Sequence, residues 1–283
     1  MQHLKRIQYF GVLFIFALCA LLWAWNEKEA HGILKTEGEL SLLVGLTPIE
    51  RSLFFDYPSS MGLLNEMIVQ YKLFSIQDVE NLSAQERRLW NKLQAAPMWK
   101  GVAALLLTWY KTGNFGPKEP IMEKIRQGEV WRFFTPCLLH KDLFHLLFNM
   151  SWLWILGCQI EARLSRIRFF LLIGILGVIS NTAQYLMGGP YFLGFSGVVA
   201  GMAGFIWMRQ KKAPQEKYPL PKPAALFLFY CILAMMSLEA ILFIVQMIFP
   251  FTTVFNIANT AHIVGGVTGL MLGRGVLFAR RRG

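Results

Sequence analysis

The stretch that decides the fold is Gly194-Phe195-Ser196-Gly197-Val198-Val199-Ala200-Gly201-Met202-Ala203-Gly204. The lone hydroxyl of Ser196 stands between glycines at the start of a run of apolar and very small residues. Gly194 and Gly197 remove the Cβ bulk that would shield this hydroxyl, and Gly201 extends a face on which a second membrane helix can pack closely. A packing helix whose serine bonds back to its own carbonyl is the competing interpretation. A base and an oxyanion site elsewhere in the chain would decide between them.

The composition is that of a polytopic membrane protein. Of the 283 residues, 55% are apolar and 16% are charged, and the mean hydropathy is +0.42. Several charge-free runs approach the ~20 residues that a bilayer-spanning helix needs. The net charge of +11 therefore indicates basic membrane loops and not nucleic-acid binding. The four cysteines are not closely paired, so neither a disulfide framework nor a zinc site is expected, and no cofactor is predicted.

The N-terminal part divides into a tail with a membrane helix, residues 1–25, and a charged segment, residues 26–130. Two interpretations of the apolar run Tyr9–Trp25 compete, a signal peptide and a first membrane helix. We favour the membrane helix, because the run ends in interfacial tryptophans and lacks a small-residue cleavage site. In residues 26–130, capping boxes at 47–50 and 83–86 predict helix starts, and short amphipathic helices are expected over 63–74 and 87–93. The apolar stretch 98–110 is too short to span a bilayer.

Residues 131–283 carry the remaining predicted spans, at about 143–160, 169–187, 193–208, 224–248 and 257–278. With six spans in the chain, every basic cluster beside a short loop falls on one side, which the positive-inside rule makes cytoplasmic. The predicted fold class is therefore an all-α polytopic membrane protein. It is expected to be a bundle of six transmembrane helices with a long outer loop between the first two and both termini in the cytoplasm.

Two of these spans supply the groups that Ser196 needs. His145 and Asn149 lie four residues apart near the outer end of the second span, so they share one helix face. His262 begins the sixth span above a ladder of glycines, which includes Gly265 and Gly269. We predict that close packing of the fourth and sixth spans brings the Ser196 hydroxyl within hydrogen-bond reach of the His262 imidazole.

This constellation predicts acyl transfer. Ser196 would be the nucleophile and His262 its base, with His145 and Asn149 as side-chain oxyanion donors beside the Ser196 backbone N–H. No aspartate lies in any predicted span, so no third triad member is expected. The chain has neither a His-Glu-x-x-His motif nor paired intramembrane aspartates, which argues against metalloprotease and aspartyl protease chemistry.

On these residues the chain resembles the rhomboid intramembrane serine proteases over 129–283. The matching motifs, in chain order, are Trp131-Arg132, His145-x-x-x-Asn149, Gly194-Phe195-Ser196-Gly197 and Ala261-His262-x-x-Gly265-x-x-x-Gly269. Glu161 also falls where that family places a structural glutamate, at the cytoplasmic end of the second helix. Any one motif is weak, but four in the right order are specific.

The resemblance implies a Ser–His dyad in a water-filled cavity open to the outside of the lipid bilayer. It implies cleavage of single-pass transmembrane proteins near that surface, in the plasma (inner) membrane of a bacterium. Phe255 would lie in a cap over the site. Ala200 stands where the family often has an aromatic residue that stacks on the histidine ring, and the first seventy or so residues of the outer loop have no counterpart in the resemblance.

Two other classes of protein remain open. One is a proteolytically inactive relative that binds or retains membrane clients, although both Ser196 and His262 are present. The other is a transporter or channel, which should carry ionisable groups near the bilayer midplane. Glu239 is the one candidate for such a group within the predicted spans, and its position nearer the outer interface argues against a transport pathway.

Overall fold

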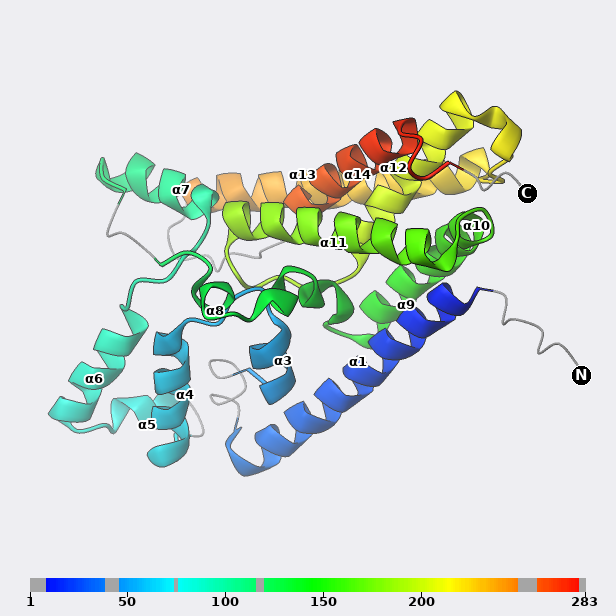
Figure 1. Ribbon diagram of the computed structural model, residues 1–283. Helices are drawn as coiled ribbons and strands as arrows, with labels where there is room; N and C mark the ends of the chain where they lie inside the picture. Colours follow the sequence, from blue (N-terminus) through cyan, green and yellow to red (C-terminus); the bar gives the residue numbers. More distant parts are fainter. Residues whose placement is uncertain (1–8, 39–45, 74–75, 116–119, 249–258, 280–283) are drawn as a thin grey trace, which may run out of the picture.

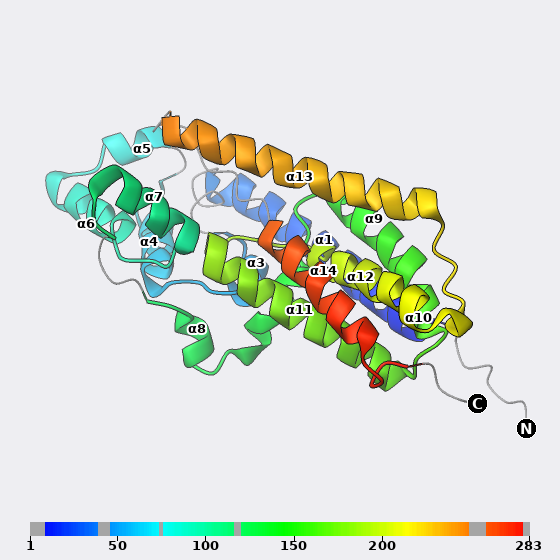
Figure 2. The same ribbon diagram turned by 90° about the horizontal axis from the view of Figure 1, so that it is seen from above.

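The computed structural model describes residues 9–38, 46–73, 76–115, 120–248 and 259–279, and every regular element in these ranges is helical. The predicted all-α class is therefore confirmed. The long helices α1 (Phe10–Thr36), α11 (Arg166–Gly188), α12 (Ser196–Lys212), α13 (Lys222–Ile248) and α14 (Asn259–Arg274) form a bundle, with shorter helices gathered at one end (Figure 1). Seen from above, α12 and α14 lie between α11 and α13 (Figure 2).

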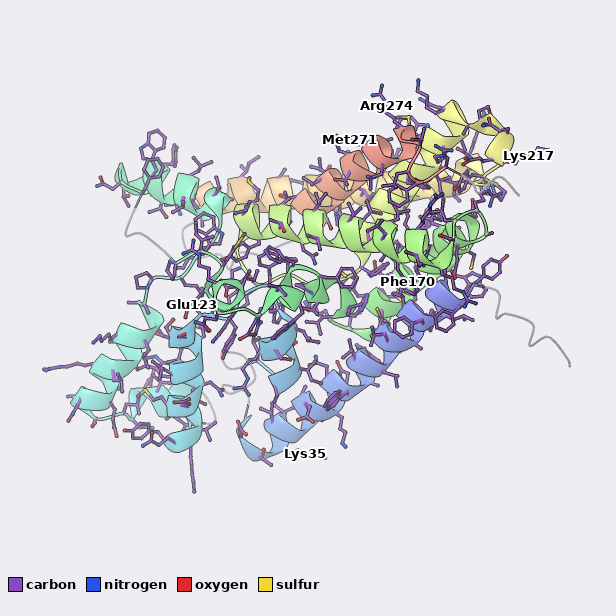
Figure 3. The ribbon with its side chains drawn as sticks, in the orientation of Figure 1. Lys35, Glu123, Phe170, Lys217, Met271 and Arg274 are labelled. Carbon is purple, nitrogen blue, oxygen red and sulfur yellow. The ribbon has the colours of Figure 1, made fainter. Side chains whose placement is uncertain are left out.

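Three helical stretches in the described residues are long and apolar enough to cross a membrane: Phe10–Thr36, Leu143–Glu161 and Arg166–Gly188. The second of these is made of α9 (Leu143–Trp152), a π-helical turn, η3 (Leu153–Gly157), and α10 (Cys158–Glu161). Helices α12 and α14 have 17 and 16 residues. Lys217 and Arg274 lie at one end of the bundle and Lys35 at the other (Figure 3). The count of six spans stays a prediction.

Helix α1 is longer than the apolar run at its start. The run ends at Trp25, but the helix continues through charged residues to Thr36, with the indole Nε1 of Trp25 donating to Glu29 one turn on (3.1 Å). At the other end, buried Glu161 accepts hydrogen bonds from the backbone N–H groups of Gly11 (2.7 Å) and Val12 (3.0 Å). These N–H groups have no partner within α1, so the carboxylate caps its first turn.

Residues 26–130 form short helices: α3 (Pro48–Leu53), α4 (Ser59–Gln70), α5 (Ile76–Glu80), α6 (Ala84–Gln94), α7 (Val102–Thr112) and α8 (Glu123–Arg126). Both predicted capping boxes are confirmed, at Thr47–Glu50 and Ser83–Glu86. Helix α4 begins and ends about a turn before the predicted range, and α6 is longer than predicted. A small local core lies between α4 and α6, made of Leu64, Met67, Ile68, Leu73 and Trp90.

Two short 3-10 helices lead from this segment into the bundle, η1 (Val130–Phe133) and η2 (Thr135–Leu138). They contact α11 at Gly177, where the absence of a side chain leaves room for the Phe134 ring. A Cβ atom on Gly177 would lie only 2.7 Å from this ring. The amide of Asn181 on α11 also donates to the carbonyl oxygens of Phe133 (3.0 Å) and Phe134 (3.2 Å). A third 3-10 helix, η4 (Pro214–Glu216), follows α12.

Candidate active site

Ser196 begins α12 directly after a turn that only glycine can make. Gly194 has φ +114°, a conformation that L side chains rarely adopt, and its N–H donates to the Pro136 carbonyl of η2 (3.1 Å). A Cβ on Gly194 would also lie 2.6 Å from the Cε1 atom of His145. The predicted need for a glycine here therefore has two physical causes, the backbone conformation and the histidine ring packed against it.

His262 lies in the first turn of α14 and faces Ser196. Its Nε2 atom is 2.7 Å from the Ser196 Oγ atom, and its side chain is 4% exposed. Within the part of the chain that the structure describes, its Nδ1 atom has no hydrogen-bond partner. For Ser196 to donate to Nε2, that nitrogen must be the unprotonated one, and Nδ1 then carries the hydrogen. No described carboxylate orients the ring.

The glycines of α12 and α14 set the distance between the two helices. A Cβ on Gly265 would overlap the Gly197 carbonyl oxygen, and a Cβ on Gly269 would overlap that of Gly201. A Cβ on Gly201 itself would lie 2.6 Å from Leu176 of α11 and 3.0 Å from the Gly265 carbonyl oxygen. The two backbones therefore touch directly, with no side chain between them. Gly201 does more than predicted, because it also admits a side chain from α11.

The two predicted oxyanion donors lie one turn apart on α9. Asp142 is the N-cap residue of this helix, and its carboxylate accepts the His145 backbone N–H (2.8 Å). Asn149 is 1% exposed, and its Nδ2 atom donates to the His145 carbonyl (2.9 Å). This bond was not anticipated. It uses one of the two amide hydrogens, so the second remains available as a donor.

A further histidine that the prediction of the site had left out lies beside these two. His140 is 2% exposed, and its ring packs edge-on against that of His145 with centroids 5.3 Å apart. Its Nδ1 atom is 3.3 Å from the Leu138 carbonyl oxygen. Burial, and then the nearby His145, lower the pKa of His140 to about 3. The side chain is therefore neutral at physiological pH.

The predicted supporting residues Arg132 and Glu161 lie outside this cluster. Arg132 is buried, and its guanidinium binds Glu129 (2.7 Å) and the carbonyls of Arg51 (2.8 Å) and Phe54 (2.7 Å) at the end of α3. Glu161 caps α1, as described above. Glu161 therefore binds the start of α1, and Arg132 binds the end of α3. The predicted cap residue, Phe255, lies outside the described residues.

Two polar residues that were not predicted hold the helix of His262. Gln184 of α11 is buried and its Oε1 atom accepts the backbone N–H of Ala261 (3.2 Å), beside His262. Asn259, one turn before His262, donates from Nδ2 to the Met235 carbonyl of α13 (3.1 Å). A signal for the first of these exists in the sequence, because Ser180, Asn181, Gln184 and Tyr185 form a polar stripe in an otherwise apolar span.

No group of three or more His, Cys, Asp or Glu side chains among the described residues is arranged to hold a metal ion. Ser196, His262, His145 and Asn149 offer a hydroxyl, two imidazoles and an amide, groups that can transfer protons and donate hydrogen bonds.

Comparison with known proteins places this chain among known families. A family model described as the Rhomboid domain matches residues 127–278. Three proteins named Rhomboid protease GlpG, from Salmonella paratyphi A, Salmonella newport and Salmonella typhi, are each 34% identical to this chain over 156 residues. The alignment covers 55% of this chain and 50% of each relative. The chain thus spans about half the length of the curated relatives that it matches.

The chain belongs to the rhomboid family, and it is an integral membrane protein with several apolar helices. Every candidate residue described above lies within the matched range, whereas residues 26–126 lie outside it.

Proposed function

We propose that this chain is an intramembrane serine endopeptidase that cleaves single-pass transmembrane proteins near the outer membrane surface. The observation that carries the proposal is the 2.7 Å approach of Ser196 Oγ to His262 Nε2, across two helices in backbone contact. Membership of the rhomboid family and the printed names of the relatives, rhomboid proteases, support the same reaction class. An inactive relative would have no need for this pair.

The reaction follows from the positions of the groups. His262 takes the proton of the Ser196 hydroxyl as Oγ attacks the carbonyl carbon of the scissile peptide bond. The oxyanion of the tetrahedral intermediate accepts hydrogen bonds from the Ser196 N–H, the free Asn149 amide hydrogen and the His145 ring. His262 then protonates the leaving amine, and the C–N bond breaks. A water molecule, deprotonated by His262, hydrolyses the acyl-enzyme and regenerates Ser196.

The test uses purified protein in detergent or liposomes, with a single-pass membrane substrate and a fluorophosphonate that labels reactive serines. Ser196→Ala and His262→Ala should each abolish cleavage, and His262→Ala should also abolish labelling. Ser151→Ala and His31→Ala are matched controls, because Ser151 and His31 are exposed and bond to carbonyls of their own helices. Cleavage that survives Ser196→Ala would contradict the dyad. An unlabelled wild-type protein would support the inactive relative.

We also propose that both termini lie in the cytoplasm and that the turn after α11 faces outside. Basic residues follow α10, α12 and α14, while the turn at 187–192 carries no charge. In a variant without native cysteines, Pro190→Cys should react with an impermeant thiol reagent added to intact cells, and Gln215→Cys should not. Labelling of Gln215→Cys from outside would overturn this orientation.

A further inference from the structure

The loop that leads to Ser196 is held by residues from outside the rhomboid domain. Helix α11 ends at Gly188 and α12 begins at Ser196. A Cβ on Gly101 would lie 2.6 Å from the Gly188 nitrogen, and a Cβ on Gly189 would lie 3.1 Å from the Lys100 carbonyl. The backbones of residues 100–101 and 187–189 are therefore in direct contact. Residues 100–101 precede the range 127–278 that the family model matches.

Aromatic side chains extend this contact. The Phe55 ring stacks on that of Tyr185 in α11, with ring centroids 4.4 Å apart, and packs against that of Phe192 in the loop, with ring centroids 6.0 Å apart. The indole Nε1 of Trp99 donates to the Tyr185 carbonyl (2.8 Å). All four residues, Phe55, Trp99, Tyr185 and Phe192, are buried in one cluster. The loop before the serine is thus packed on one side by residues of the N-terminal segment.

A buried carboxylate completes the arrangement. Asp56 is 2% exposed, and its Oδ2 atom accepts the Tyr185 hydroxyl (2.9 Å) and the Glu123 backbone N–H (2.9 Å). Its Oδ1 atom accepts the N–H of Lys124 (3.0 Å). Asp56 therefore joins α11 to the start of α8, where Glu123 is labelled in Figure 3. A buried carboxylate with several donors fixes their relative positions, because breaking any of these bonds leaves charge unsatisfied.

We propose that Phe55, Asp56 and Trp99, which we call the clasp, position the nucleophile. The inference rests on the proposed function of Ser196. Tyr185, which the clasp holds, adjoins Gln184, and Gln184 accepts the N–H of Ala261 beside His262 (3.2 Å). The outer end of α11 is therefore connected to both members of the proposed dyad. The clasp holds that end and the following loop, so that Ser196 Oγ stays within reach of His262.

The glycines of this loop explain why contacts from outside it matter for the position of Ser196. Gly189 and Gly194 have φ +82° and +114°, and glycine leaves a chain more conformational freedom than any other residue. A displacement of about 1 Å between reacting groups can cost ~100-fold in rate. The clasp restricts the loop from one side, and the bond from Gly194 N–H to Pro136 restricts it near the serine.

The test compares Trp99→Phe, which removes the indole donor, with Trp90→Phe, a matched change in the local core of α4 and α6. Four quantities are measured: kcat and KM for a single-pass substrate, the rate of Ser196 labelling by a fluorophosphonate, and amide hydrogen exchange in residues 187–195. For Trp99→Phe we expect kcat and the labelling rate to fall about 10-fold with KM unchanged, since the reacting groups are displaced. Exchange in 187–195 should be faster. Trp90→Phe should leave all four quantities unchanged.

Other outcomes separate this proposal from the proposed function. A raised KM with an unchanged labelling rate in Trp99→Phe would overturn the clasp and assign the segment to substrate binding. Equal labelling and exchange in the two variants would also overturn it. If the wild-type protein neither labels nor cleaves, the proposed function fails, and exchange in 187–195 still decides whether the clasp holds the loop. Asp56→Asn gives a second variant, expected to act in the same direction as Trp99→Phe.

Discussion

The two ends of the α12–α14 pair share close backbone packing at glycines but differ in their polar contacts. At the end that carries Ser196, an uncharged serine binds an imidazole, with the Ser196 Oγ atom 2.7 Å from the His262 Nε2 atom. At the other end, buried Arg209 binds Glu216 of η4 through both carboxylate oxygens, with Nε to Oε2 at 2.9 Å. It also donates to the carbonyls of Gly273 (3.2 Å) and Gly275 (3.3 Å).

This difference indicates what a substitution at each end would change. At the Ser196 end the two backbones are in contact, so even one added methyl group would move the helices apart and displace the reacting groups. A buried ion pair tolerates small shifts but leaves an uncompensated charge if one partner is lost. We therefore expect changes at the Ser196 end to act mainly on activity, and changes at the Arg209 end to act mainly on stability.

Apart from changes to Ser196 and His262 themselves, the largest effect is expected at Asn149. Removal of one preorganised oxyanion donor lowers kcat by ~100- to 1000-fold, so Asn149→Ala should do the same with little change in KM. Gln159→Ala is the matched control, because Gln159 lies on the same span and its amide also donates to the carbonyl four residues earlier (2.8 Å). A change confined to KM would make Asn149 a substrate-binding or packing residue.

A single methyl group at Gly265 should come next. Because its Cβ would overlap the Gly197 carbonyl oxygen, Gly265→Ala should separate α12 from α14 and lower kcat by about 100-fold. Overpacking of this kind should cost ~1–3 kcal/mol of unfolding free energy. Gly174→Ala on α11 is the control, since no atom lies within 4 Å of the added Cβ. Normal cleavage by Gly265→Ala would show that close packing at this glycine does not determine the distance between Ser196 and His262.

At the other end, Arg209→Ala should destabilise the protein by ~3–5 kcal/mol, because it removes the guanidinium that forms an ion pair with the buried carboxylate of Glu216. The specific activity of the protein that remains folded should change little. The double variant Arg209→Met with Glu216→Leu should recover most of the stability, as apolar replacements of buried pairs often do. Denaturant unfolding in detergent measures both, and a loss below ~1 kcal/mol in Arg209→Ala would contradict the assignment.

The smallest effect is a pH dependence at His140, whose ring packs against His145. His140 has a pKa of about 3 in the folded protein and near 6.5 when unfolded. Between these values the unfolded chain binds more protons, so stability is present above pH ~6.5 and is lost as the pH falls towards 3. Thermal unfolding between pH 7 and pH 4 should show a shallower decline in His140→Gln than in the wild type. Identical slopes would mean that His140 is not buried in the neutral form.

Residue types and their spacing predicted the proposed nucleophile, base and oxyanion donors of the candidate site, but not His140, Gln184 or Asn259. Ser196, His145, Asn149 and His262 were found because their polar groups stand out in apolar or glycine-rich spans. The capping boxes at Thr47 and Ser83 were found because both partners lie within one helical turn. The first helix was predicted to end at residue 25, but α1 continues to Thr36. The apolar run shows which part of a helix can lie in lipid, and a helix can continue beyond that part into water.

The sequence by itself therefore determined the all-helical class, the two capping boxes and the chemical groups available to the site, because these follow from the residues themselves and from their near neighbours in the chain. Only the tertiary structure decided that Glu161 caps α1, that Arg132 binds carbonyls of α3 and that Asp56 joins α8 to α11. Each of these bonds has a backbone group or a distant residue as its partner. Backbone N–H and C=O groups are the same at nearly every position, so nothing in the order of side chains shows which of them a buried polar group will meet.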